Sequence, residues 1–155
     1  MTCTFFGHRD TPTKIEPLLK ETLTDLIENK GVDLFYVGNQ GNFDAMARKV
    51  LSKLSQTYPI TYRVVLAYFP KEEMEYSNYT ILPDGIEDVP PRFAISYRNK
   101  WMLEKADYVI TYVTPPTGGA AQFKTMAQNQ RKIVLECSIN ETEKPNIRSQ
   151  SANIR

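Results

Sequence analysis

Short apolar runs alternate with longer amphipathic segments along the chain, and this alternation constrains the fold more than any other feature. Runs rich in β-branched and aromatic residues predict five strands, at residues 2–6, 32–37, 60–69, 108–113 and 132–137. Apolar residues spaced near the helical period predict helices at residues 15–29, 43–54, 91–105 and 120–130. We therefore predict an α/β protein, with a mostly parallel sheet of about five strands and helices on both faces.

The length of 155 residues fits one domain with a buried core. We predict that residues 1–138 form this domain and that residues 139–155 form a polar C-terminal tail. Residues 70–90 contain three prolines and a charged cluster, and they predict a long loop. Such a loop is either a lid or binding loop, or a solvated surface connection.

Composition narrows the classes of partner. The net charge of +1 provides no bulk attraction to nucleic acid or to an anionic membrane. No run approaches 18 apolar residues, and the first residues lack the basic start and the apolar stretch of a signal peptide. Cys3 and Cys137 fall in predicted strands, which favours buried free thiols in a reducing compartment. We expect a cytoplasmic protein without a membrane partner.

Three polar turns follow predicted strands, at residues 7–9, 38–44 and 117–119. In a parallel sheet with right-handed crossovers, the C-terminal ends of all strands lie at one edge, here called the carboxyl edge. Ligands bind outside this edge where the strand order reverses. Glycine turns that open helices also expose backbone amides that can bind phosphate. We expect these turns to meet and to bind a nucleotide-sized anion.

The turns supply most of the candidate site. Arginine offers a forked donor to phosphate, and an asparagine after a strand can cap the next helix or reach a base. Asp44 could accept a hydrogen bond from a ribose hydroxyl, or it could simply favour the helix dipole. The predicted nucleotide-binding residues are Gly7, His8, Arg9, Gly38, Asn39, Gly41, Asp44, Arg98, Thr117, Gly118 and Gly119.

Two of these residues have plain structural alternatives. His8 is equally interpreted as a turn residue bonded to backbone, and Arg98 as a member of a surface salt bridge. One histidine with two distant cysteines does not make a closed metal site, so no metal is predicted. The chain also lacks an intact Gly-x-Gly-x-x-Gly fingerprint, a P-loop and a serine elbow.

The motifs resemble those of one superfamily. Residues 3–9, Cys-Thr-Phe-Phe-Gly-His-Arg, resemble the opening Cys-x-Phe-Thr-Gly-His-Arg of the YpsA/YoqJ-like proteins, which belong to the SLOG superfamily of Smf/DprA and LOG proteins. Residues 38–47 resemble its second glycine-rich turn, and residues 98–110 are similar to its arginine helix and Ala-Asp-x-Val-Ile strand. Residues 117–119 match its Gly-Gly-Thr-like turn in part, because no threonine follows the glycines.

The resemblance covers roughly residues 3–137 and implies a Rossmann-like three-layer sandwich. It implies binding of a nucleotide or an ADP-ribose-like molecule at the carboxyl edge, with no further cofactor, in sensing or sequestering a signal. Superfamily members often pair through helices, which is compatible with a homodimer. DprA relatives bind DNA, but the near-neutral charge argues against nucleic acid here.

The resemblance leaves an enzymatic alternative open. The phosphoribohydrolases of the superfamily carry Pro-Gly-Gly-x-Gly-Thr-x-x-Glu, whose glutamate helps to cleave an N-glycosidic bond. Residues 116–125 of this chain contain no glutamate, which favours binding over hydrolysis. The alternative is an N-glycosidase or phosphoribohydrolase acting on nucleoside monophosphates. Its candidate catalytic residues are Asp44, as the carboxylate, and Arg98, which matches the arginine of the catalytic pair.

Overall fold

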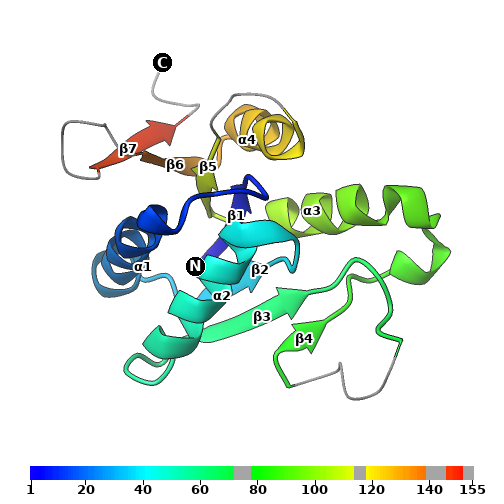
Figure 1. The fold of residues 1–155 in the computed structure, drawn as a ribbon, viewed down its shortest axis with the longest axis horizontal. Helices are drawn as coiled ribbons and strands as arrows, with labels where there is room; N and C mark the ends of the chain where they lie inside the picture. The colour runs from blue at the N-terminus through cyan, green and yellow to red at the C-terminus, as the bar shows by residue number, and fades with distance from the viewer. Residues whose placement is uncertain (72–77, 114–117, 139–145, 152–155) are drawn as a thin grey trace.

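The computed structural model describes residues 1–71, 78–113, 118–138 and 146–151. A single sheet carries helices on both faces, which confirms the predicted α/β class (Figure 1). The strands are β1 (Thr2–Gly7), β2 (Leu34–Val37), β3 (Thr61–Val65), β4 (Thr80–Ile81), β5 (Tyr108–Tyr112), β6 (Ile133–Ser138) and β7 (Asn146–Ser151). The helices are α1 (Glu16–Lys30), α2 (Gly41–Leu54), α3 (Ala94–Lys105) and α4 (Gly119–Asn129), with 3₁₀ turns η1 (Thr13–Ile15), η3 (Ile86–Asp88) and η4 (Pro91–Phe93).

The order of the strands across the sheet is β4-β3-β2-β1-β5-β6-β7. The pairs from β1 to β6 are parallel, and β7 pairs antiparallel with β6. The chain builds outward from β1 through β2 and β3 to β4, and then crosses back to place β5 on the other side of β1. The strand order therefore reverses between β1 and β5, which is where open α/β sheets bind ligands.

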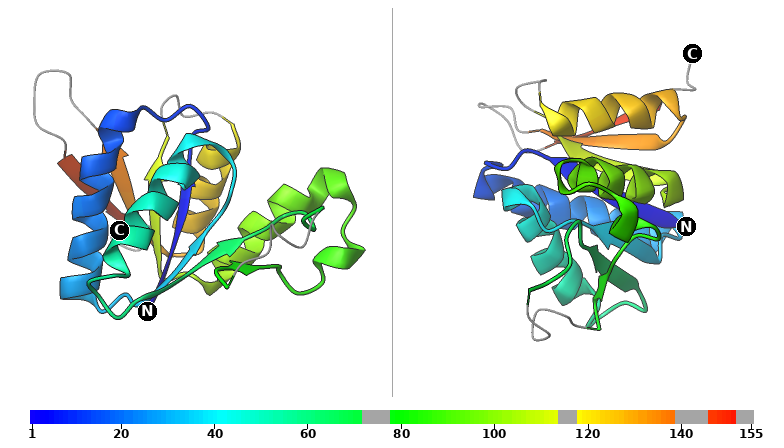
Figure 2. Two further views of the ribbon diagram at one scale, coloured as in Figure 1. Left: turned by 60° about the horizontal axis from the view of Figure 1, so that its bottom comes forward. Right: turned by 90° about the vertical axis from the view of Figure 1, so that its right-hand side faces the viewer.

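Apolar side chains on both faces of the strands create the three layers. In β1, Cys3 and Phe5 pack toward one core and Phe6 packs toward the other, as the alternation of a strand requires. The first core includes residues of α1 and α2, and the second includes residues of α3 and α4. Figure 2 shows the two helix layers on opposite sides of the sheet.

The structure contains two strands that the sequence did not predict, and one predicted strand is shorter than expected. β4 has only two residues, within the segment predicted as a long loop, and β7 lies within the segment predicted as a polar tail. The predicted strand at 60–69 ends at Val65, and β4 then pairs alongside it. Both new strands are held by backbone ladders and lack the apolar periodicity on which the prediction depended.

The helix boundaries follow the sequence signals closely. α1 ends at Lys30 and is capped by Gly31, whose φ of 72° is the left-handed conformation expected of a C-terminal cap. α3 starts at Ala94 instead of Pro91, because the first three predicted residues form the turn η4. Cys3 and Cys137 are buried free cysteines. None of the helices in the described part of the chain has the length and apolarity needed to cross a bilayer.

Candidate functional site

A pocket of about 300 Å³ opens at the carboxyl edge, where the strand order reverses between β1 and β5. Its walls come from four segments that are far apart in the sequence: the end of β1 with the turn after it, the start of α2, one side of α3 and the first turn of α4. The six predicted residues that line it are Gly7, His8, Arg9, Asp44, Arg98 and Gly119.

The other predicted residues lie around this pocket, with one exception. Asn39 accepts a hydrogen bond from Arg98, and Gly41 lies against the backbone of Arg9. Gly118 is the N-cap of α4, directly before a residue that lines the pocket. Thr117 lies outside the described residues. The three predicted turns thus gather at one place, as far as the described residues extend.

Asp44 is a buried carboxylate in the first turn of α2, with only 8% of its surface exposed. Its Oδ2 accepts a hydrogen bond from the backbone N–H of Gln40 at 3.0 Å. Burial raises the pKa of Asp44 to about 6, although that N–H and the charges of Arg98 and Arg48 act in the opposite direction. A carboxyl group that titrates near neutral pH inside a pocket can exchange a proton with a ligand.

Arg98 is almost completely buried, with 2% of its surface exposed. Its Nη1 donates to the Val65 carbonyl at 2.9 Å and to Asn39 Oδ1 at 3.2 Å, and its Nε donates to Asn99 Oδ1 at 2.8 Å. Burial lowers the pKa of Arg98, while the nearby Asp44 carboxylate acts against that shift. Arg98 is therefore not the surface salt bridge considered as an alternative. It ties α3 to the end of β3 and to the turn after β2.

Gly38 provides the space in which Asp44 and Arg98 come together. A Cβ atom at Gly38 would lie 2.6 Å from Asp44 Oδ2 and 3.1 Å from Arg98 Nη1. Any side chain here would displace the carboxylate, the guanidinium or both. Two amides of this turn are already engaged within the protein, because the Gln40 N–H donates to Asp44 and the Asn42 N–H donates to the Arg9 carbonyl.

Gly7 and Gly41 also serve the packing of the turns. A Cβ at Gly7 would lie 2.1 Å from the ring of Phe43, so the missing side chain makes room for this ring. Gly41 has a φ of 83°, and its Cβ would lie 2.6 Å from the Cα of Arg9. The turns after β1 and β2 are therefore packed directly on each other.

The start of α4 differs from these crowded turns. Gly118 and Gly119 are exposed, and no described atom lies within 4 Å of the place where either Cβ would be. Gly118 has a φ of 90°, and α4 begins without a side-chain cap. Because the first amides of a helix carry partial positive charge, this end of α4 has the chemistry that attracts an anion.

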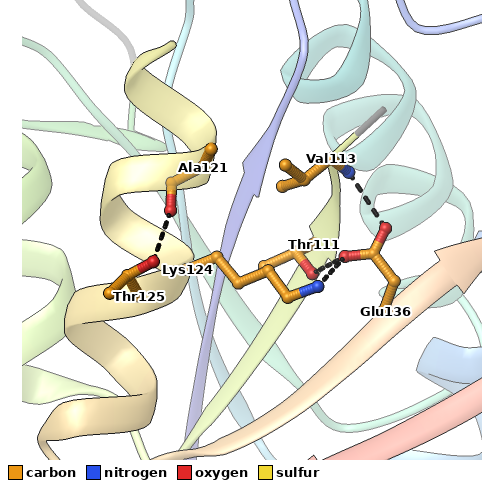
Figure 3. Close-up of polar contacts among 6 residues, drawn as sticks. All are labelled: Thr111, Val113, Ala121, Lys124, Thr125 and Glu136. Atoms are coloured by element: carbon orange, nitrogen blue, oxygen red, sulfur yellow. Dashed lines mark hydrogen bonds and ion pairs between the residues drawn. The ribbon is translucent and has the colours of Figure 1, made fainter. Parts of the chain in front are cut away.

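A partly buried ion pair that the sequence analysis missed connects α4 to β6 (Figure 3). Glu136 of β6 is 7% exposed, and its Oε1 accepts hydrogen bonds from Lys124 Nζ at 3.0 Å and Thr111 Oγ1 at 2.6 Å. Its Oε2 accepts the backbone N–H of Val113 at 2.9 Å. A glutamate inside an apolar strand was the available signal, because a buried charge requires partners.

The remaining chemistry of the described residues is limited. Among them, no group of three or more histidine, cysteine, aspartate or glutamate side chains could hold a metal ion. His8 lies edge-on to Tyr112, with ring centroids 6.4 Å apart, and its backbone N–H donates to the Tyr112 carbonyl. Comparisons with protein-family models, with curated proteins and with solved structures find no match for this chain.

The buried Asp44 leads to a prediction about stability and pH. Folding raises the pKa of Asp44 from 3.8 to about 6. The free energy of unfolding therefore falls as the pH rises between these two values, and it stays at the lower level at higher pH. The shift corresponds to roughly 3 kcal/mol. We expect Asp44→Asn, measured by urea unfolding, to be more stable than wild type by about 2–3 kcal/mol at pH 8 and by much less at pH 4.

Asp10→Asn is the matched control for this prediction, because Asp10 is an exposed carboxylate in the turn after β1. It should follow the wild-type pH profile. Two results would contradict the claim that burial destabilises the Asp44 carboxylate. One is an Asp44→Asn protein that is less stable than wild type at pH 8, and the other is a stability difference between the two proteins that does not change with pH.

The ion pair in Figure 3 yields a second prediction. Lys124→Met leaves the Glu136 carboxylate buried beside two neutral donors, and we expect it to lower the free energy of unfolding by about 2 kcal/mol. Adding Glu136→Gln should recover part of this loss in denaturant unfolding. Thr125→Ala, on the next residue of α4, is the control and should change stability by about 0.5 kcal/mol or less. Equal stability of Lys124→Met and wild type would show that the pair contributes nothing.

Proposed function

We propose that this chain binds a nucleotide or a nucleotide-derived ligand in the pocket between β1 and β5, and that it senses or sequesters this ligand. The observation that carries the proposal is the pocket itself. It lies where the strand order reverses, and it combines a helix N-terminus that no described side chain caps with a buried carboxylate and an exposed arginine. This combination suits a molecule with an anionic group at one end and hydroxyl groups at the other.

The two ends of the pocket favour one orientation of the ligand. The phosphate is expected at Gly119 and Ala120, where the amides of α4 and the guanidinium of Arg9 attract negative charge. The ribose is expected beside Asp44, since a carboxylate accepts hydrogen bonds from hydroxyl groups and repels phosphate. Arg98 would act indirectly, by holding Asn39 and the end of β3 in place.

The resemblance to the YpsA/YoqJ-like proteins of the SLOG superfamily supports the same proposal. Its opening motif ends in Gly7, His8 and Arg9, and all three line the pocket. We include membership of this superfamily in the proposal, together with a cytoplasmic location and, as a further proposal, pairing of two copies through helices.

A specific observation also favours the enzymatic alternative, hydrolysis of an N-glycosidic bond. Such a reaction needs a carboxyl group beside the anomeric carbon, to stabilise positive charge and to position water. Asp44 lines the pocket, and its pKa of about 6 allows both protonation states near neutral pH. The chain places no glutamate on the described part of α4, so Asp44 is the carboxylate that this alternative requires.

Ligand binding is tested with purified protein and a panel of AMP, ATP, NAD, ADP-ribose and cyclic nucleotides. We expect at least one of these to raise the melting temperature and to bind in calorimetry. Arg9→Ala should then raise the Kd about tenfold, because it removes a charge-assisted contact to phosphate. Lys20→Ala removes one positive charge from an exposed position of α1 and should leave the Kd unchanged. No binding across the whole panel would overturn the proposal.

Hydrolysis is tested by chromatographic detection of free base after incubation with nucleoside monophosphates. If the alternative holds, wild type releases base and Asp44→Asn does not, while Asp10→Asn keeps the activity. Release of base that persists in Asp44→Asn would remove Asp44 from the mechanism. The absence of release from wild type would exclude these substrates and leave binding alone.

A further inference from the structure

Two aromatic side chains lie exposed immediately after the end of β3. Tyr68 is 46% exposed and Phe69 is 53% exposed. Two other exposed aromatic residues have partners for their rings: Tyr79 stacks on Tyr62, and Phe93 is covered by the guanidinium of Arg92. Within the described residues, no ring or cation contact covers Tyr68 or Phe69.

These two rings line a second hollow, of about 520 Å³, at the same carboxyl edge. Asn39, Leu66 and Lys71 also line it. The hydroxyl of Tyr68 donates to the Pro91 carbonyl at 3.1 Å, which fixes the position of that ring. The lining of the hollow therefore combines two aromatic residues and an aliphatic residue with the amide of Asn39 and with Lys71.

The hollow adjoins the pocket between β1 and β5. Asn39 lines the hollow and the next residue, Gln40, lines the pocket. Asn39 Oδ1 accepts hydrogen bonds from Arg98 Nη1 and from Gln40 Nε2. Because Oδ1 is held in this way, the Nδ2 group of Asn39 is the donor that remains to meet an acceptor on a ligand.

We infer that the hollow is a second subsite, which binds the heteroaromatic base of the nucleotide by stacking on Phe69 and Tyr68; this inference rests on the proposed function. Stacking on aromatic side chains accepts any base, because every base presents a π-face. The amide of Asn39 then adds one hydrogen bond to the edge of the base. The phosphate-binding end of the same ligand lies at α4.

The spacing of the strands indicates the size of the ligand. Neighbouring strands lie about 4.8 Å apart, so the ends of β1 and β3 are separated by about 10 Å. The start of α4 lies beyond β1 on the side away from β3. A mononucleotide has a single ribose between its base and its phosphate. A pyrophosphate-linked nucleotide, with a second phosphate in the chain, is the better match to this span.

The experiment compares a probe that has a base with one that lacks it. ADP-ribose and inorganic pyrophosphate are titrated into wild type, Phe69→Ala and Phe93→Ala by calorimetry. Phe93 is the matched control, because it is an equally exposed phenylalanine that does not line the hollow. We expect Phe69→Ala to raise the Kd for ADP-ribose about tenfold and to leave the Kd for pyrophosphate unchanged. Phe93→Ala should change neither value.

The outcomes separate this inference from the proposed function. If wild type binds neither ADP-ribose nor pyrophosphate, nor any nucleotide in the panel, the proposed function fails. If wild type binds ADP-ribose and Phe69→Ala binds it equally well, the base subsite fails and the proposed function stands. If Phe69→Ala raises the Kd for ADP-ribose and for pyrophosphate to the same degree, the ring does not contact the base specifically, and the proposed base subsite is again wrong.

Discussion

The carboxyl edge of this protein depends on the hydrogen bonds that the buried guanidinium of Arg98 donates. This guanidinium joins α3 to the last carbonyl of β3 and to the turn after β2, three segments that do not adjoin in the sequence. Guanidinium is the one cationic group that can satisfy several acceptors in fixed directions without losing its charge on burial. Its positive charge also makes the burial of Asp44 tolerable, because the two groups converge on the space left by Gly38.

The two halves of the carboxyl edge are built in different ways. The turns after β1 and β2 are closely packed. Their glycines leave room for a phenylalanine ring, a carboxylate and the backbone of the neighbouring turn. The backbone N–H groups of Gln40 and Asn42 already donate hydrogen bonds within the protein. At the start of α4, the described residues leave the space beside Gly118 and Gly119 empty, although the helix that follows is held by the ion pair of Glu136 and Lys124. Turns that are packed against each other before a ligand arrives need little further ordering when it binds.

The sequence predicted the fold because its signals are local and periodic. Strand and helix alternation, the cap at Gly31 and the packing of β1 on both faces all follow from residue type and spacing. β4 and β7 could not be found in this way, because they form through backbone pairing with strands whose position is set by the rest of the sheet. The largest shift of a helix boundary is at the start of α3, because the residues from Pro91 to Phe93 form a 3₁₀ turn before the helix.

The sequence predicted which turns lie together at the carboxyl edge, but not how their side chains are arranged. Parallel topology alone places the turns after β1 and β2 together. The burial of Arg98 depends on the Val65 carbonyl and on Asn39, whose proximity only the folded chain creates. A single sequence also cannot distinguish a glycine that admits a ligand from one that admits Phe43. Glu136 could have been noticed in the sequence, because it is a charged residue inside an apolar strand.

The placement of the two cysteines has a consequence for chemical reactivity. Burial raises the pKa of Cys137 to about 12 and that of Cys3 well above its ordinary value, so neither forms the thiolate that reacts with alkylating reagents at neutral pH. Both sulfurs lie in the core between the sheet and α1. Labelling of these thiols therefore requires the core to open, and its rate in native conditions reports how often the molecule unfolds.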